Sequence, residues 1–299
     1  MEEKLNELKR RIQSNADATE EALGAMYGER DEDLQKIFDA QTYSLLGGGK
    51  RIRTFLVNEF CRALGGDVAL SMPYACALEM IHTYSLIHDD LPCMDDDDVR
   101  RGKPANHKQF GYATALLAGD ALLTKAFLVA STNPKGTAEQ NVEAVRLLSS
   151  AAGDLGMIGG QVMDLHGETE RLSFEQLLRL HSMKTAALMK CAALLGCLAA
   201  GYPVGTPQAE AAELYAAKVG LTYQVIDDIL DDCGEENTLG KNLGTDSSHN
   251  KTTFMTYFNA SDAKKYAEGL TAEAISAIAH WENSEMLTDL AAYLVNRTY

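Results

Sequence analysis

Two stretches of this chain consist largely of aspartate: DDLPCMDDDD at residues 89–98 and DDILDD at residues 227–232. Each begins inside an apolar helical run, residues 81–91 and 221–230, whereas acidic segments of a protein surface have polar neighbours. Carboxylates that enter a core require a cation to neutralise them. Oxygen ligands without an accompanying set of His or Cys favour Mg²⁺, which keeps water and substrate phosphate in its coordination shell. The two stretches therefore predict helices that hold a multi-metal site between them.

The rest of the chain has the composition of a helical protein. It has 299 residues and only six prolines, and Ala, Leu, Glu and Met, which favour long helices, are abundant. No stretch resembles an interdomain linker, and no alternating apolar pattern indicates strands. We therefore predict an all-α fold with a single domain that covers residues 1–299.

The formal charge argues against several partners. The 27 basic and 43 acidic residues give a net charge of −16, whereas nucleic acid and anionic membranes bind basic surfaces. Residues 1–30 contain neither an apolar signal segment nor an Arg-rich transit pattern, which predicts a cytoplasmic protein. The most apolar stretch, residues 185–201, is interrupted by Lys190 and is slightly short for a membrane span. We expect a buried helix there and no membrane insertion.

The spacing of apolar residues places the acidic stretches at the ends of long helices. Three- and four-residue periodicity predicts helices at about residues 5–27, 34–46, 54–64, 68–91, 109–130, 139–155, 160–166, 173–200, 207–232 and from 261 to the C-terminus. Polar, Gly-containing loops are predicted directly after each acidic stretch, at residues 99–107 and 235–251.

The second acidic stretch predicts metal ligands on one helix face. Asp227 and Asp231 are four residues apart and project from the same face, and Asp228 and Asp232 form a second pair beside them. The alternative is an acidic helix end in solvent. The apolar residues directly before Asp227 are hard to reconcile with free solvent, so we favour Asp227, Asp228 and Asp231 as ligands.

The first acidic stretch requires a break in its helix. Asp89 and Asp95 are six residues apart and would lie on different sides of an ideal helix. Pro92 cannot donate to the carbonyl of His88 and its ring crowds that carbonyl, so we expect a local bulge that places Asp95 beside Asp89. Asp89, Asp90 and Asp95 are then the predicted ligands, whereas residues 96–98 fit an acidic loop.

Basic residues are few and gather near these carboxylates. They form three sets: Lys50, Arg51 and Arg53 after a triple glycine, Arg100 and Arg101 after the first acidic stretch, and Lys184, Lys241 and Lys251. Arginine offers a planar fork for phosphate oxygens, and glycines let backbone N–H groups approach an anion. Each set alone would be ordinary surface charge, but their placement predicts a diphosphate site. His82, two helical turns before Asp89 on the same face, could reach a phosphate or be a structural histidine.

Several motifs in a fixed order indicate a family. They are GGKRIR (residues 48–53), HDDLPCMDD (88–96), RRGKP (100–104), LAGDAL (117–122), GGQ (159–161), KT (184–185), QVIDDILD (224–231) and GK (240–241). In this order the motifs resemble the short-chain trans-prenyl diphosphate synthases, and most closely the bacterial farnesyl type, from about residue 34 to residue 251.

The resemblance implies a bundle of long antiparallel helices around a deep central cavity, usually as a homodimer. It implies three Mg²⁺ ions held by Asp89, Asp90, Asp95 and Asp227, with Asp231 acting through neighbouring groups. Positions that hold the allylic diphosphate match Arg100, Lys184, Gln224 and Lys241. Positions that hold isopentenyl diphosphate match Lys50, Arg53, His82 and Arg101. Thr185 matches a residue that stabilises the carbocation.

The implied reaction joins isopentenyl diphosphate to an allylic diphosphate, either dimethylallyl or geranyl diphosphate. The allylic C–O bond ionises, the isopentenyl double bond attacks the cation, and a proton is lost. Four residues separate Asp90 from Asp95, and Tyr84 lies five residues before the first aspartate. Both features match the farnesyl type, in which the ring closes the pocket after fifteen carbons. Tyr84 could also be an ordinary core residue, and a geranylgeranyl diphosphate synthase is the alternative within the family.

Two alternatives come from other classes. A class I terpene cyclase would be expected to carry an Asn/Ser/Glu-type second metal motif and to lack the basic residues Lys50 and Arg53. A non-catalytic prenyltransferase-like subunit would be expected to lose one acidic stretch, and this chain keeps both. One departure from the family pattern is Ala186, which replaces the usual glycine after Lys184 and Thr185 and could narrow a kink beside the carbocation.

Overall fold

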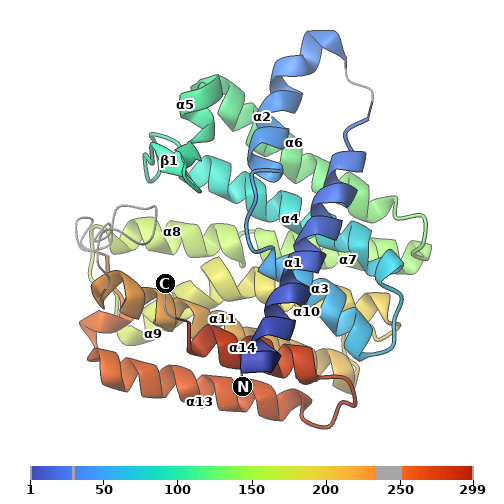
Figure 1. Ribbon diagram of the computed structural model, residues 1–299. Coiled ribbons are helices and arrows are strands. Elements are labelled where there is room, and N and C mark those ends of the chain that lie inside the picture. The colour runs from blue at the N-terminus through green and yellow to red at the C-terminus, as the bar shows by residue number, and fades with distance from the viewer. Residues whose placement is uncertain (1, 29–30, 234–250, 298–299) are drawn as a thin grey trace.

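The computed structural model describes residues 2–28, 31–233 and 251–297, and helices dominate them (Figure 1). The helices are α1 (Glu2–Ala25), α2 (Gln35–Leu45), α3 (Ile52–Ala63), α4 (Val68–Asp89), α5 (Asn106–Phe110), α6 (Tyr112–Ser131), α7 (Ala138–Ala152), α8 (Met157–Gly167), α9 (Phe174–His181), α10 (Ala187–Ala199), α11 (Pro207–Cys233), α13 (Ala260–Ile278) and α14 (Glu285–Val295). Short elements are two 3₁₀ turns (Glu32–Leu34 and Phe254–Thr256), a π-helix (Ser182–Ala186) and the strands β1 (Val99–Arg100) and β2 (Lys103–Pro104). Because these two strands form the only sheet in the described ranges, the predicted all-α fold is confirmed.

Helix α10 forms the centre of the bundle. All of its residues except Lys190 are buried, and it packs against α3, α4, α7 and α11. The ammonium group of Lys190 lies 3.6 Å from the carboxylate of Glu213 on α11. Figure 1 shows α13 along one edge of the bundle and α2 at the opposite edge, with α10 between them. The buried helix expected at residues 185–201 is therefore confirmed.

Two helical segments, Tyr112–Ser131 and Phe174–Ala199, are long and apolar enough to cross a membrane by length and composition. Core helices of globular proteins meet the same criterion, so this is weak evidence for a membrane span. In the second segment 72% of the most apolar window is buried inside the bundle. In the first segment, which is α6, only 33% is buried. Helix α6 therefore keeps an apolar face at the surface.

Three predicted helices are interrupted. Gly111, with a φ of +90° that only a residue without Cβ adopts easily, separates α5 from α6. The helix expected at residues 173–200 is divided by the π-helix, and residues 279–284 separate α13 from α14. The loop expected at residues 99–107 contains the hairpin and the start of α5.

The acidic stretches begin in the last turns of two long helices, as predicted. Helix α4 starts at the N-cap Asp67, whose carboxylate accepts a hydrogen bond from the N–H of Ala69 at 2.8 Å. It ends at Asp89 rather than at residue 91. Helix α11 runs to Cys233 and so contains all of residues 227–232. Helices α3 and α10 pack between them through contacts from α4 to α3, from α3 to α10 and from α10 to α11.

Candidate active site

The chain turns sharply after α4 and brings Asp95 beside Asp89. The backbone N–H of Asp95 donates to the carbonyl of Asp89 at 2.9 Å, and the N–H of Met94 donates to the carbonyl of Leu91 at 2.8 Å. Asp89 and Asp95 therefore lie next to each other, as predicted. The predicted bulge was wrong, because Pro92 lies in a turn that follows the helix.

Asp89 lies in surroundings that disfavour its charged form. Burial raises the pKa of its carboxyl to about 6, the nearby Lys184 opposes this shift, and the negative charge of Asp95 adds to it. A carboxylate with insufficient positive charge around it fits a cation site. The donors Asp89 and Asp95 are hard oxygen atoms, which suit Mg²⁺.

The β1–β2 hairpin places Arg100 against the first acidic stretch. The Nε of Arg100 donates to Asp90 at 2.8 Å, and a second nitrogen of the guanidinium also contacts this carboxylate. Arg100 further reaches Asp97 at 3.2 Å. Asp90 is only 2% exposed. In this structure Asp90 therefore binds an arginine that the sequence assigned to the diphosphate.

The side chain of Arg101 lies against the triple glycine at residues 47–49. Arg101 donates to the carbonyl of Gly48. Gly49 has a φ of +124°, and a Cβ there would lie 3.0 Å from the guanidinium carbon of Arg101. The absence of a side chain at Gly49 therefore lets the hairpin approach the start of α3.

His82 on α4 contacts Arg53 on α3. A guanidinium nitrogen of Arg53 lies 3.3 Å from Nε2 of His82, and since arginine can only donate, Nε2 is the acceptor. Burial, followed by the charge of Arg53, lowers the pKa of His82 well below its usual value, so the imidazole is neutral. Lys50 lies nearby in sequence, with its Nζ 5.9 Å from the ring centre of Tyr293. Arg51 instead pairs with the buried Glu79 at 2.6 Å and belongs to the core.

Three side chains connect the first acidic stretch to the π-helix. Lys184 donates to Asp164 of α8 at 2.6 Å. The ammonium group of Lys251 lies 3.3 Å from the same Asp164 oxygen and 3.8 Å from Asp95. Asp164 thus holds two lysines beside Asp95. These lysines come from segments that are more than 60 residues apart in sequence.

The π-helix that carries Lys184 and Thr185 is closely packed between α8 and α11. A Cβ at Gly160 of α8 would lie 2.2 Å from the backbone nitrogen of Lys184, and one at Gly220 of α11 would lie 2.7 Å from the Cβ of Ala186. The hydroxyl of Thr185 donates to Oε1 of Gln224 on α11 at 2.8 Å. The side chain at Ala186 is therefore accommodated because Gly220 faces it.

The carboxylates of the second acidic stretch have different surroundings. Asp227 is contacted by Arg297, whose guanidinium also lies 4.0 Å from the ring centre of Tyr223. Asp228 is only 6% exposed and accepts a hydrogen bond from the N–H of Phe254 at 2.7 Å. Asp231 is half-buried. Lys241, assigned from sequence to the diphosphate, lies outside the described residues.

Tyr84 is buried on α4, one and a half turns before Asp89. Its ring meets the ring of His88 edge to face at 5.6 Å and is 5% exposed. Among the described residues the phenol oxygen has no hydrogen-bond partner. Burial raises the pKa of Tyr84 to about 12, so the phenol is neutral at physiological pH.

Comparison with known proteins identifies the family. The family model described as "Polyprenyl synthetase" matches residues 34–292. The chain belongs to this family. It is 42% identical over 279 residues to farnesyl diphosphate synthase of Geobacillus stearothermophilus, covering 93% of this chain and 92% of the relative. It is also 42% identical to a chloroplastic geranylgeranyl pyrophosphate synthase of Catharanthus roseus, covering 88% and 74%.

A solved polyprenyl synthetase relative has the same fold. The geranyltransferase of Helicobacter pylori, solved with magnesium and isoprenyl diphosphate, superposes with a TM-score of 0.83 at 31% identity, covering 97% of this chain and 96% of that one. The resemblance inferred from the motifs is confirmed, as is a trans-prenyltransferase activity class.

Sequence reasoning did not select two residues that the structure brings to the site. Asp164 lies three residues after the GGQ motif and was given no role, although it holds Lys184 and Lys251. Arg297 follows α14 and contacts Asp227, 70 residues earlier. The amphipathic pattern of α14 predicts a packed helix, but no local signal says which residue its end will reach.

Proposed function

We propose that this polyprenyl synthetase condenses isopentenyl diphosphate with dimethylallyl or geranyl diphosphate and releases farnesyl diphosphate. The observation that carries the proposal is the line of contacts from Asp95 through Lys251 and Asp164 to Lys184. It joins the carboxylates of the first acidic stretch to cations that suit a diphosphate. The relative from Geobacillus stearothermophilus, similar over nearly its whole length, carries the name of this activity.

The proposed cofactor is Mg²⁺, with three ions when substrate is bound. Asp89 and Asp95 would hold ions from one side, together with Asp90 once Arg100 turns to the diphosphate. Asp227 with Asp231 would hold ions from the other side. The all-oxygen donor set and the raised pKa of Asp89 support this assignment. When bound, Mg²⁺ neutralises charge on the departing diphosphate. The contacts of Asp228 with the N–H of Phe254 favour a structural role for this carboxylate, so we leave it out of the proposed set.

Cationic and polar side chains would orient the allylic diphosphate. Lys184 lies next to the carboxylates, and Arg100 reaches them from the hairpin. Gln224 accepts a hydrogen bond from the Thr185 hydroxyl, so the hydroxyl oxygen of Thr185 can face positive charge on the allylic carbons. The family match adds Lys241. We propose that the released diphosphate takes the proton lost in the last step, because no side chain is needed for that transfer.

A second basic group would bind isopentenyl diphosphate. Lys50, Arg53, His82 and Arg101 match the family positions, and Arg53 and His82 are in contact. Neutral His82 accepts a hydrogen bond from Arg53 and so holds the Arg53 guanidinium in place. The remaining N–H groups of Arg53 can then donate to phosphate.

The product length follows from the position of Tyr84. The ring is packed on α4 beside His88 and upstream of Asp89, where it could close the pocket after fifteen carbons. The geranylgeranyl alternative is favoured by relatives such as the chloroplastic enzyme of Catharanthus roseus, whose identity to this chain is the same. We retain it as the second candidate.

The proposed homodimer would cover an apolar surface made by three consecutive helices. Helix α6 packs against α7, and α7 against α8. Their apolar side chains at the surface include Leu117 (55% exposed), Leu128 (61%), Val142 (70%), Ile158 (45%) and Val162 (57%). A surface of this kind is typical of protein interfaces. We also propose a cytoplasmic location.

One incubation tests the activity. Purified protein is mixed with Mg²⁺, labelled isopentenyl diphosphate and either dimethylallyl or geranyl diphosphate, and the dephosphorylated prenols are separated. Farnesol as the main product would support the proposal. Geranylgeraniol would transfer support to the second candidate, cyclic hydrocarbons would indicate a terpene cyclase, and failure to incorporate label would indicate a non-catalytic subunit.

A further inference from the structure

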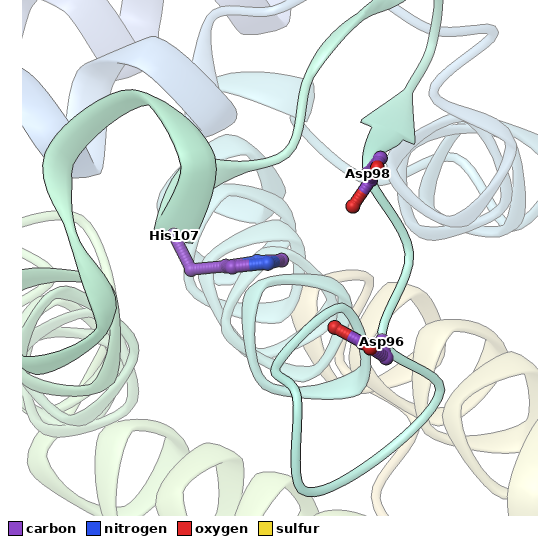
Figure 2. Close-up of side chains that lie close together, drawn as sticks. All are labelled: Asp96, Asp98 and His107. Atoms are coloured by element: carbon purple, nitrogen blue, oxygen red, sulfur yellow. The ribbon is translucent and has the colours of Figure 1, made fainter.

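Three possible metal ligands lie together outside the proposed catalytic set. Asp96 and Asp98 follow the first acidic stretch, and His107 lies in α5. Their ligand atoms all lie within 4.8 Å of one another. Figure 2 shows the His107 ring directed toward the region between the two carboxylates. We propose that these side chains bind one divalent transition-metal ion that is separate from the catalytic Mg²⁺.

His107 is the observation that points to a ligand. It is only 7% exposed, and within the described part of the chain neither of its ring nitrogens has a hydrogen-bond partner. Buried polar groups are almost always paired, so an imidazole with two unpaired nitrogens requires an explanation. Its ring is directed toward the region between the two carboxylates. A cation between the three groups would give one of the ring nitrogens a partner and offset the repulsion between the carboxylates.

Backbone pairing in the hairpin brings Asp98 and His107 near one another. The N–H of Ala105 donates to the carbonyl of Asp98 at 2.8 Å, directly before the hairpin pair of Val99 and Pro104. This pairing brings Asp98 alongside the start of α5, from which His107 projects. The ligands are thus held near one another by the hairpin and do not depend on a metal ion for their approach.

The ligand types select a class of metal. An imidazole nitrogen with two carboxylate oxygens suits Zn²⁺, Co²⁺ or Mn²⁺, whereas Mg²⁺ prefers oxygen alone. Neighbouring ligands around Zn²⁺ lie about 3 Å apart, so the carboxylates must close by roughly 1–2 Å. Both carboxylates are exposed and able to move. The Nζ of Lys108, which lies 2.6 Å from Asp98, would have to leave, and its side chain is 43% exposed.

Occupancy would fix the hairpin that carries Arg100 and Arg101. The site joins residue 96, before β1, to residue 107, after β2. A bound ion would therefore link the two ends of the segment that contains the hairpin. Amide hydrogens of residues 99–105 should therefore exchange more slowly with the ion than without it.

Zn²⁺ binding in the presence of excess Mg²⁺ tests the site. Protein is dialysed against Zn²⁺ with Mg²⁺ in large excess, and bound zinc is measured by elemental analysis. We expect one equivalent in the wild type and at least tenfold weaker binding in His107→Gln and Asp96→Asn. Asp96 is exposed and has a φ of +51°, which asparagine tolerates, so this variant should fold normally.

Two further variants separate this site from the others. Asp89→Asn removes a proposed catalytic ligand and should leave the zinc equivalent unchanged. His166→Gln changes an exposed histidine on α8 and serves as the matched control. With Mn²⁺ as the probe, pulsed EPR should show an imidazole nitrogen coupling that His107→Gln removes. The proposal is overturned if the wild type retains no zinc, if Asp89→Asn loses it, or if the nitrogen coupling persists in His107→Gln.

Discussion

Replacing Gly160 with alanine tests whether α8 sets the position of the π-helix. The added Cβ would lie 2.2 Å from the backbone nitrogen of Lys184 and 2.6 Å from its Cα. Non-bonded carbon atoms pack at about 3.5–4.0 Å, so α8 and the π-helix must separate by roughly 1 Å. Because the contact is with backbone, no change of side-chain rotamer can relieve it.

Two opposing effects determine the size of the change. Overpacking of this kind costs about 1–3 kcal/mol in the free energy of unfolding, and replacing glycine by alanine inside a helix returns about 1 kcal/mol. The net expectation is a loss of up to about 2 kcal/mol. Activity should suffer more, because a displacement of about 1 Å in a group that positions substrate can cost about 100-fold in rate. Lys184 and Thr185 are such groups in the proposed mechanism.

Thermal unfolding and kcat with geranyl diphosphate measure the two effects. Gly269→Ala on α13 is the matched control, because a Cβ there meets no atom within 4 Å. This control should gain about 0.5–1 kcal/mol in stability and keep the wild-type rate. A Gly160→Ala protein with the stability of the control and the wild-type kcat would refute the close packing on which the argument rests.

Four further predictions concern product length, pH, assembly and ligand coupling. Tyr84→Ala should shift the main prenol from farnesol to geranylgeraniol or longer, whereas Tyr84→Phe should keep farnesol because the phenol oxygen has no hydrogen-bond partner in the described structure; unchanged chromatograms for Tyr84→Ala would exclude this ring as the pocket floor. The pKa of Asp89 is raised in the folded state, so ionising this carboxyl destabilises the fold. This destabilisation is absent below the unfolded pKa of about 4, grows as pH rises, and is complete above about pH 6. Metal-free Asp89→Asn should therefore be more stable than the wild type at pH 7 by at most about 3 kcal/mol but not at pH 4; equal urea midpoints at pH 7 would contradict the burial of this charge. Leu128→Glu on the exposed apolar face of α6 should convert a dimer to a monomer in light scattering, and Val204→Glu, at a similarly exposed apolar position (47%) after α10, should not; a dimer in both variants would place the interface elsewhere. Mg²⁺ and inorganic diphosphate together should raise the melting temperature by more than the sum of their separate effects, and additive shifts would argue against linked binding.

The sequence predicted the helices whose ends depend on local residues. Helix α4 starts after Asp67 because the carboxylate caps the N-terminus, and the break after Asp89 follows from Pro92. The π-helix could not be predicted in this way. Residues 173–200 keep helical periodicity throughout, and the extra residue in the turn is tolerated because Gly160 and Gly220 leave space for it. Both glycines lie on other helices, so the π-helix depends on tertiary packing and not on its own sequence.

The same distinction applies to the candidate site. The nearness of Asp89 and Asp95 was predictable, since only five residues separate them and one of these is a proline. The pairing of Asp90 with Arg100 was not, because it requires the two-residue strands of the hairpin to form. The contact between Arg297 and Asp227 depends on the path of α13 and α14 across 70 residues. The motifs thus predicted which residues would be ligands or cations, whereas the contacts between these residues could be found only from the fold.

The ion pairs at the site give a physical reason for linked binding of metal and diphosphate. Arg100 contacts Asp90, Lys184 contacts Asp164, and Arg297 contacts Asp227. Diphosphate alone would have to attract these cations away from their carboxylates. A metal ion alone would have to displace Arg100 from Asp90 and Arg297 from Asp227. When both bind, the carboxylates gain new positive partners while the arginines and lysines gain phosphate oxygens, so neither set is left uncompensated in a partly buried site. Each ligand therefore lowers the cost of binding the other, and the two affinities must rise by the same factor.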